Sequence, residues 1–420
     1  MKISRIIARE IFDSRGLPTI ECSLFLEDGR FVKSSVPSGA STGKFEAHEL
    51  RDGGKRLFGK GVSKAINNIE SIIAPALIGK EVDAISTDLI LLNLDGTDNK
   101  SKLGANAILA VSMAAFRAQA LVQDMELYEL IAHLHGTPAV SIPFAMMNFI
   151  NGGMHADNFL RIQEFMILPT KGSSFRQSVE SSIEVYYKLK ELLKENERST
   201  AIGDEGGFAS EFANDLEALD FLVEAIAATP SAKENEFGIA LDVAASEFYN
   251  SKKKIYDWNG KIFTSEELAN FYISLVNNYP ILSIEDGFAE DDWKGWETFN
   301  SLLGEKIQIV GDDLFVTNPE RIHKGIEKKA ANASIIKPNQ IGTITETLQA
   351  VKLCQENGFA TVISHRSGET NDSFISDLAV GTAAGQIKSG ACVRGERLAK
   401  YNRLLEIEDS LVLGELDRLI

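Results

Sequence analysis

Cysteine is scarce in this chain, because only Cys22, Cys354 and Cys392 occur among its 420 residues. An odd number of widely spaced cysteines excludes a disulfide framework, and the lack of a C-x-x-C pair excludes a thiolate zinc site. Structural disulfides are rare in reducing compartments. The cysteine usage therefore fits a cytoplasmic protein.

Long apolar runs are also missing. The longest run covers residues 107–116, whereas crossing a bilayer takes ~20 apolar residues. Lys2, Arg5, Arg9 and Glu10 interrupt the N-terminal segment in which a signal peptide needs an apolar stretch. We therefore expect no membrane span and a cytoplasmic location.

Positive charge is in deficit. The chain has 43 Lys and Arg against 60 Asp and Glu, which gives a formal net charge of -17. Such a field repels nucleic acid and anionic lipid. We expect no direct nucleic-acid partner, and an anionic substrate would need cations gathered at its site.

Several common catalytic motifs are absent. The sequence has no G-x-G-x-x-G after a strand, no G-x-S-x-G and no H-E-x-x-H, which excludes the corresponding dinucleotide, hydrolase and zincin sites. The segment SGASTG at residues 38–43 is not a P-loop, because it is one spacer short and Phe45 replaces the required Ser or Thr. We expect this segment to act as a lid that excludes water.

The sequence divides into two parts. Residues 1 to about 50 alternate polar and apolar with turn signals, which is typical of antiparallel hairpins. Apolar residues then recur at helical spacing over about 103–122, and the HGTP stretch at 135–138 breaks that pattern. We place a domain boundary there, between residues 1–137, which carry the lid, and residues 138–420.

The second part alternates short apolar runs with amphipathic stretches. Six runs lie at residues 239–241, 281–284, 307–310, 334–336, 361–363 and 386–387. Two earlier runs, at 145–150 and 164–168, raise the count to eight. Such runs are typical of parallel strands covered on both faces. The pattern predicts an α/β fold, a (β/α)8 barrel of eight parallel strands with its active site at their carboxyl ends.

An ionisable residue follows each of the six runs, in the order Asp242, Glu285, Asp312, Lys337, His365 and Lys388. The three acids would meet at the barrel mouth, where like charges oppose joint ionisation unless a cation lies among them. A site built only from oxygen donors favours a hard ion such as Mg²⁺. The alternative is that these acids cap the helices that follow them.

The basic residues at the strand ends suggest a base and an anion site. A metal cation beside Lys337 would lower the pKa of its amine and make it available as a base, although Lys337 could instead form a structural salt bridge. The cations and donors suited to a phosphate or carboxylate are His365, Arg366, Ser367 and Lys388. A surface-charge interpretation of the SHRSG run remains open.

Two further carboxylates have unusual settings. Glu164 stands at the entry to the run at 165–168, and Glu205 lies in GDEGG at residues 203–207. A close carboxylate pair can share a proton, so that one member serves as a general acid. For Glu205 alone, an ordinary glycine-rich turn is the simpler explanation. His155 is not singled out by this reasoning, because a lone loop histidine usually lies at the surface.

A metal, an amine base and a protonated carboxyl group together specify a reaction class. A proton α to a carboxylate is so weakly acidic that its removal needs positive charge to stabilise the product anion. The carboxylic acid can then help a β-hydroxide to leave. The pattern indicates elimination of water from a hydroxy acid, and the basic cluster indicates that this acid is phosphorylated.

The sequence resembles the enolase family over essentially its whole length. The shared motifs are DSRG at 13–16, VPSGASTG at 36–43, LDGTDNKSKLGANAILAVSMA at 94–114, GDEGGF at 203–208, SIEDGFAEDDW at 283–293, GDDLFVTN at 311–318, KPNQIGT at 337–343 and SHRSGET at 364–370. The resemblance implies a Mg²⁺-dependent lyase that reversibly dehydrates 2-phospho-D-glycerate to phosphoenolpyruvate in glycolysis and gluconeogenesis. It also implies that residues 1–137 form an α+β capping domain in front of the barrel.

The resemblance assigns roles to individual residues. The ligands of the first of two Mg²⁺ ions match Asp242, Glu285 and Asp312, and a lid serine that joins the second ion matches Ser41. The base matches Lys337, and the acid with its partner matches Glu205 and Glu164. The active-site histidines match His155 and His365. The substrate contacts match Gln163, Arg366, Ser367 and Lys388, together with Ser41.

The family pattern also raises expectations about assembly. It implies a homo-oligomer, a dimer or an octamer, with possible roles in a multi-enzyme or RNA-degradation complex or, after non-classical export, at the cell surface.

The chain departs from the family at Leu17, Ser210 and Gly395. These changes affect the rigidity of loops, and none of them lies at a matched site residue. Two alternatives remain. One is an acid-sugar dehydratase or racemase of the same superfamily, against which the lid and the Arg366/Lys388 cluster argue. The other is an interaction protein.

Overall fold

Three antiparallel strands begin the chain: β1 (Ile3–Phe12), β2 (Pro18–Leu26) and β3 (Phe31–Ser35). The computed structural model describes residues 1–39 and 43–417. The turn between β2 and β3 contains Gly29, whose φ of +89° favours glycine. The predicted hairpin-rich segment is confirmed.

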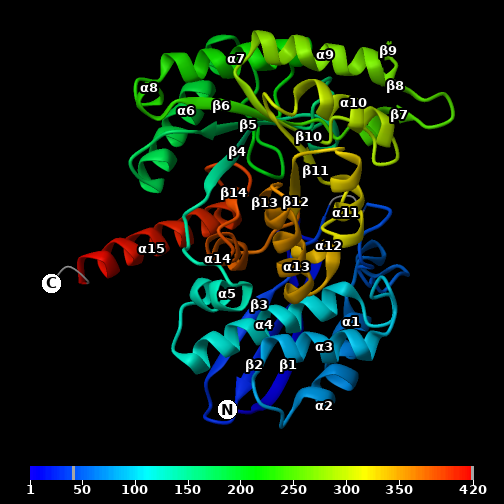
Figure 1. The fold of residues 1–420 in the computed structure, drawn as a ribbon, viewed down its shortest axis with the longest axis vertical. Helices are drawn as coiled ribbons and strands as arrows, with labels where there is room; N and C mark the ends of the chain where they lie inside the picture. Colours follow the sequence, from blue (N-terminus) through cyan, green and yellow to red (C-terminus); the bar gives the residue numbers. More distant parts are fainter. Residues whose placement is uncertain (40–42, 418–420) are drawn as a thin grey trace.

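Helices complete the N-terminal part (Figure 1). They are η1 (Arg56–Gly59), α1 (Ser63–Asn68), η2 (Ile69–Ile73), α2 (Ala74–Leu77), α3 (Ala84–Asp95), α4 (Ala105–Gln123) and α5 (Leu127–His135). By length and composition alone, α4 is the one helix of the described residues that could cross a membrane, but 83% of its apolar window is buried inside the structure. It packs against β2 and β3 and therefore serves as the core helix of this part.

Eight strands form a closed barrel in the second part of the chain. In order around the barrel they are β4 (Phe144–Asn151), β5 (Glu164–Pro169), β6 (Phe237–Asp242), β10 (Ile281–Glu285), β11 (Gln308–Gly311), β12 (Ala333–Ile336), β13 (Ala360–Ser364) and β14 (Gly385–Lys388). All eight correspond to the apolar runs in the sequence. The predicted fold class, a barrel preceded by a smaller α+β part, is confirmed.

The expectation of eight parallel strands is wrong in one respect, because β5 runs antiparallel to both β4 and β6. Parallel neighbours need a crossover, usually a full helix, on one face of the sheet. The link between β4 and β5 contains only the short turn η3 (Gly153–His155), so the chain reverses direction. The reversal places Glu164, the first residue of β5, opposite Asp242, the last residue of β6.

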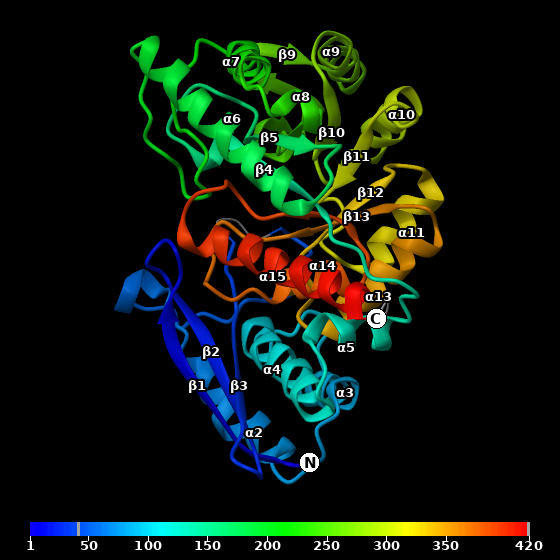
Figure 2. The same cartoon turned by 90° about the vertical axis from the view of Figure 1, so that its left-hand side faces the viewer.

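Helices lie around the barrel (Figure 2), and a small three-stranded sheet lies near one side of it (Figure 1). The main helices are α6 (Phe175–Glu195), α7 (Asp215–Ala228), α9 (Ser265–Asn278), α10 (Trp293–Leu303), α11 (Pro319–Lys328), α13 (Ile344–Glu356), α14 (Phe374–Gly381) and α15 (Gly395–Asp417). The short elements are α8 (Ala232–Asn235), η4 (Ala245–Phe248), α12 (Pro338–Ile341), and the strands β7 (Tyr249–Asn250), β8 (Ile255–Trp258) and β9 (Lys261–Phe263). Side-chain caps mark several starts, such as Thr264, which forms a capping box with Glu267.

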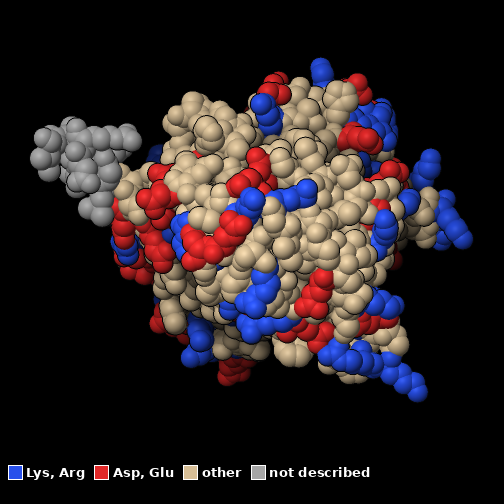
Figure 3. Space-filling model, turned by 90° about the horizontal axis from the view of Figure 1, so that it is seen from below, with Lys and Arg blue, Asp and Glu red and all other residues tan. Residues whose placement is uncertain are grey.

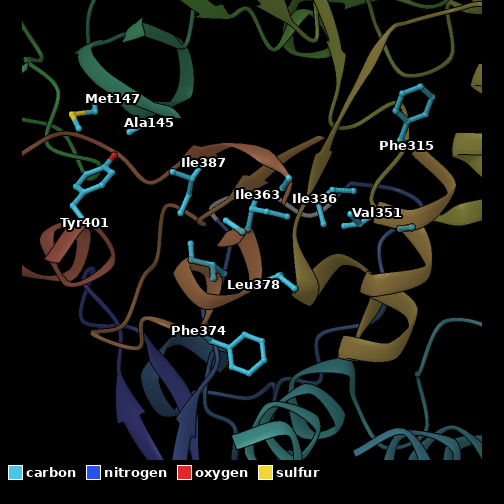
Figure 4. Close-up of a cluster of buried hydrophobic side chains, with 14 of the residues drawn as sticks. Ala145, Met147, Phe315, Ile336, Val351, Ile363, Phe374, Leu378, Ile387 and Tyr401 are labelled. Atoms are coloured by element: carbon cyan, nitrogen blue, oxygen red, sulfur yellow. The ribbon is translucent and has the colours of Figure 1, made fainter. Parts of the chain in front are cut away.

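Successive residues of a strand face opposite sides of the barrel wall. Figure 4 shows Ile336, Ile363 and Ile387 pointing outward toward α14 and α13. Their neighbours along the strands fill the interior, in a separate cluster that includes Ile335 and Val362. Both faces of the sheet are therefore apolar, and the polar groups are left to the strand ends.

Buried polar contacts join the two parts of the chain. Arg117 on α4 donates to both carboxylate oxygens of Asp372, each at 2.7 Å. Asp88 on α3 accepts from the backbone N (2.9 Å) and Oγ1 (2.6 Å) of Thr345 at the start of α13. Asp88 is fully buried, and this burial raises the pKa of its carboxyl from 3.8 to about 6.

Asp88→Asn should therefore stabilise the protein relative to wild type increasingly as the pH rises through this range. A carboxyl whose pKa is higher in the folded state contributes stability that is complete below the unfolded pKa and is lost as the pH rises through the folded pKa. A difference of roughly two pH units corresponds to about 3 kcal/mol. Urea unfolding of both proteins between pH 4 and 8 measures the effect. The exposed Glu70→Gln is the control, and a pH-independent difference for Asp88→Asn would contradict the shift.

Candidate active site

Three carboxylates meet at the carboxyl end of the barrel. Asp242 ends β6, Glu285 ends the neighbouring β10, and Asp312 follows β11. The register pairs Glu285 with Asp242 on one side and with Val310 on the other. All three acids are at most 8% exposed. The structure therefore brings together the three acids that the strand pattern predicts.

None of these acids caps the helix that follows it. The N-cap residues of η4, α10 and α11 are Ala244, Asp292 and Asn318. The helix-capping alternative is therefore wrong, and the carboxylates remain directed into the mouth.

Lys388, at the end of β14, reaches across the mouth to three acids. Its Nζ lies 3.0 Å from Asp242 Oδ2, 2.9 Å from Glu285 Oε2 and 3.2 Å from Glu164 Oε2. Burial alone would lower the pKa of Lys388, but these carboxylates outweigh it and raise the pKa well above its usual range. Lys388 is therefore a permanent cation among the acids.

Lys337 points into the same mouth and pairs with Asp312. Gln340 Nε2 donates to the other oxygen of Asp312 at 2.8 Å. Burial lowers the pKa of Lys337, and the nearby cations Arg366 and Lys388 act in the same direction. The carboxylates around it, Asp312 first and then Glu285, together outweigh these effects, so the pKa is raised. The prediction that a metal cation beside Lys337 lowers this pKa stays a prediction, since in this arrangement the nearest charge to the amine is the Asp312 carboxylate.

Glu164 and Glu205 face each other across the other side of the mouth. Burial and the negative charge of Glu205 raise the pKa of Glu164 well above its ordinary value. Burial acts in the same direction on Glu205, but its neighbours His155, His365, Arg397 and Lys388 together outweigh burial and lower its pKa. The two carboxyl groups therefore differ in proton affinity, as expected of a pair that shares one proton.

Two histidines flank this acid pair. His155 Nδ1 lies 3.5 Å from Glu164 Oε1 and 3.7 Å from Glu205 Oε2. His365 Nε2 lies 3.6 Å from the same oxygen of Glu205. His155, which reasoning from the residues alone did not select, is thus part of the mouth; its loop joins β4 to the reversed strand β5.

Two groups of three side chains in the described part of the chain have potential metal-ligand atoms within 4.8 Å of one another: His155, Glu164 and Glu205, and Asp286, Asp312 and Asp313. Asp286 is committed to the backbone, since its two oxygens accept from the N–H groups of Asp312 and Asp313, both at 2.9 Å. The predicted set of Asp242, Glu285 and Asp312 is not among these groups. In the structure the ammonium groups of Lys388 and Lys337 bind these three carboxylates.

The residues predicted to bind an anion begin after β13. Arg366 forms a bidentate ion pair with Glu46, a residue of the N-terminal part of the chain. Its Nη1 and Nη2 donate to the two carboxylate oxygens of Glu46 at 3.0 and 3.2 Å. Ser367 and Gln163 line the same cavity. The backbone N of Gln163 donates to Asp242 O at 2.9 Å. Ser41 lies outside the described residues.

Several residues of the mouth were missed by sequence reasoning. Asn148 on β4 donates from Nδ2 to Glu205 Oε2 at 3.1 Å. Its only sequence signal is a polar residue inside an apolar strand. Arg397 contacts His365 from the distant helix α15, and Glu46 reaches Arg366 from another part of the chain. No local pattern marks these two residues, because their partners are far away in the sequence.

The loop that carries Gln163 is held by a buried brace. Asp215, the first residue of α7, accepts from the backbone N of Arg161 (2.8 Å) and Ile162 (2.9 Å) with Oδ1. Its Oδ2 accepts from Trp258 Nε1 at 2.9 Å. The brace therefore fixes the chain immediately before Glu164.

The three departures from the family pattern lie outside these contacts. Leu17 is in the β1–β2 turn, where its N–H donates to Asp13 Oδ1 at 2.9 Å. Ser210 is fully buried, and its carbonyl accepts from Asn158 Nδ2 at 3.1 Å. Gly395 begins α15 in open space, since an added Cβ would have no neighbour within 4 Å.

Acids, a lysine pair, histidines and an arginine thus converge where the strands of a closed barrel end. That end carries the active site in barrel enzymes of this architecture. The fold and the site therefore define the protein as an α/β-barrel enzyme.

Comparison with known proteins makes this class specific. The family model of the enolase N-terminal domain matches residues 3–131, and that of the enolase C-terminal TIM barrel domain matches residues 139–415. A protein named enolase from a Nitratiruptor species is 52% identical over 414 residues, which cover 98% of each chain. The chain belongs to the enolase family. Members of this family are phosphopyruvate hydratases, a class of lyases. The family implies a metal cofactor.

Asp215→Ala should loosen the segment before Glu164, because two backbone N–H groups and the Trp258 indole lose their acceptor. We expect faster hydrogen exchange at the amides of residues 161 and 162, and a loss of about 1–3 kcal/mol of stability from the orphaned donors. Exchange mass spectrometry and thermal unfolding measure both effects. Glu224→Ala, an exposed change on the same helix, is the control. Unchanged exchange at these amides would show that Asp215 is not the brace.

Proposed function

We propose that this chain interconverts 2-phospho-D-glycerate with phosphoenolpyruvate and water at the barrel mouth. The observation that carries the proposal is that Lys337 and the Glu164–Glu205 pair line one cavity. Lys337 follows β12, and Glu164 begins β5, which lies across the barrel from β12. A base and an acid on opposite sides of a substrate are what elimination of water requires. The remaining residues supply charge and orientation.

The residues of the mouth fit a divalent cation. Eight carboxylates and only three Lys or Arg side chains line the cavity. An anionic substrate could not enter such a site without additional positive charge. We assign Asp242, Glu285 and Asp312 to a first Mg²⁺, because all their donors are hard oxygens. A second ion would involve Ser41.

When bound, the metal supplies positive charge that stabilises the negative charge developing on the substrate carboxylate. The acids that would hold it now pair with Lys388 and Lys337. If Asp312 bound the metal, its charge would no longer raise the pKa of Lys337. Asp312 therefore couples metal binding to the strength of Lys337 as a base.

Lys337 is the proposed base, and its neutral amine would accept the α-proton. Glu205 is the proposed acid that protonates the leaving hydroxyl, with Glu164 as the partner that shares the proton. In the arrangement shown by the structure, Lys337 holds its proton and Glu164 has the higher proton affinity of the pair. The reactive form therefore needs the charges of the ligands to redistribute these protons.

The substrate contacts are proposed to be Gln163, Arg366, Ser367 and Lys388. A planar guanidinium suits a phosphate because it donates two parallel hydrogen bonds. In the structure both of these guanidinium donors of Arg366 bind Glu46, at 3.0 and 3.2 Å. A phosphate at Arg366 would therefore have to share the guanidinium with Glu46 or displace it.

We further propose the division between a capping domain and a barrel domain at residues 137/138, a homo-oligomeric assembly and a cytoplasmic location. The net charge of -17 argues against direct binding of nucleic acid. On the face shown in Figure 3, Lys and Arg side chains are interspersed with Asp and Glu rather than gathered into a basic patch. Size-exclusion chromatography with light scattering distinguishes a dimer from an octamer.

Lys337→Ala should abolish exchange of the α-hydrogen with solvent while the substrate still binds, because the amine that accepts the proton is gone. Loss of a general base costs about 10²- to 10⁴-fold in rate. NMR of 2-phosphoglycerate in D₂O measures the exchange, and calorimetry measures binding. Lys294→Ala, an exposed change on α10, is the control. Exchange at the wild-type rate in Lys337→Ala would refute the assignment of the base.

Removal of divalent metal with EDTA should abolish turnover and lower the thermal unfolding temperature, and Mg²⁺ should restore both. A ligand at a hundred times its Kd stabilises a protein by about 2.7 kcal/mol. Asp242→Asn should reduce the Mg²⁺-dependent rise in unfolding temperature, whereas the exposed Glu266→Gln should not. If Mg²⁺ did not change the unfolding temperature of the wild-type protein, the proposed metal site would be contradicted.

A further inference from the structure

Arg397 is a fully buried arginine near the start of α15. Its Nη1 donates to His365 Nδ1 at 2.6 Å and to Arg366 O at 2.8 Å. Its Nη2 donates to Ser367 O at 2.7 Å and to Asp204 O at 3.0 Å. One guanidinium therefore ties the segment after β13 to the loop that carries Glu205.

The chemistry of the guanidinium determines the proton on His365. Arginine keeps its charge inside proteins and has only N–H donors. The contact with Nη1 therefore requires a lone pair on His365 Nδ1. A neutral imidazole carries one proton, which must then reside on Nε2. A second proton on Nδ1 would place two N–H groups against each other beside a buried positive charge.

The Nε2 of His365 faces the proposed acid. It lies 3.6 Å from Glu205 Oε2, the oxygen that also accepts from Asn148 Nδ2 at 3.1 Å. We propose that Arg397 is a positioning residue that fixes His365 as a neutral donor, with its Nε2–H directed at Glu205. The importance of this arrangement for catalysis rests on the proposed function, whereas the tautomer itself does not.

The surrounding charges favour the same state. The groups that face His365 are Glu205, Arg397, Lys388 and Lys337. Burial lowers the pKa of His365 well below its ordinary value. Glu205 opposes this shift, whereas Arg397 and the two lysines act in the same direction as burial. His365 therefore faces Glu205 as a neutral group and does not exchange protons with it, which leaves the proton transfer to the carboxyl pair.

NMR of the full-length protein tests the tautomer directly. The chain has six histidines, so ¹⁵N-histidine labelling gives few signals, and His365→Gln identifies the signal of His365. We expect an Nε2–H imidazole with unprotonated Nδ1 that stays unchanged between pH 8 and pH 5.5. An Nδ1–H tautomer, or a titration midpoint between pH 6 and 7, would overturn the proposal. This measurement needs no turnover, so its result is independent of the proposed reaction.

Arg397→Met and Arg397→Lys test the positioning role. Without the guanidinium, His365 should become titratable, and the pH profile of kcat/KM should gain an acidic limb. We expect kcat to fall by about 10- to 100-fold, the range known for removal of the hydrogen-bond partner of a metal-bound histidine. Arg397→Lys should restore part of the rate and the wild-type profile, because an ammonium group can still donate to Nδ1.

Arg394→Met is the matched control, because Arg394 reaches the same loop at Gly203 O (3.4 Å) from beside the same helix without contacting His365. It should keep the wild-type tautomer and pH profile. A folded Arg397→Met variant with both features unchanged would refute the positioning role. If Arg397→Met does not fold, the wild-type spectrum and the Arg397→Lys profile decide the question in the same way.

Discussion

Charge compensation among buried acids is the constraint on which the rest of the site depends. Carboxylates that close together in a low-dielectric mouth cannot all ionise unless cations lie between them. Lys388 meets this requirement for Asp242, Glu285 and Glu164, and Lys337 does so for Asp312. The apolar barrel wall excludes water from both faces of the strands, so the compensation must come from side chains or ligands within the mouth.

This constraint explains why the proton affinities at the mouth differ from those of isolated side chains. Asp312 helps to keep Lys337 protonated, and the different neighbours of Glu164 and Glu205 raise the pKa of the first and lower the pKa of the second. A site balanced in this way responds strongly to any charge that enters it. An anionic substrate and a divalent cation would together change which groups hold protons, and the proposed chemistry depends on that change.

The antiparallel strand β5 gives the mouth its second side. If β5 ran parallel to its neighbours, Glu164 at its start would lie at the opposite end of the barrel from Asp242. The reversed direction instead pairs Glu164 with Asp242 and Asn151. The brace from Asp215 then holds the preceding loop. The apolar run at 164–168 predicted the strand but not its direction, because strand direction depends on how the connection folds and not on the residues of the strand.

The sequence by itself determined the eight strands, the α+β part in front of them and the ring of ionisable residues at the strand ends. These features follow from local patterns: an apolar run buries both faces of a strand, and the first polar residue after it marks the mouth. Only the tertiary structure decided which of these groups pair. Lys388 reaches Asp242 across 146 positions of the chain, and Glu46 reaches Arg366 across 320. Arg397 on the last helix directs His365, and no spacing in the sequence indicates this contact. The physical reason is that a pKa, a tautomer or an ion pair depends on distances between atoms, and closing the barrel sets those distances.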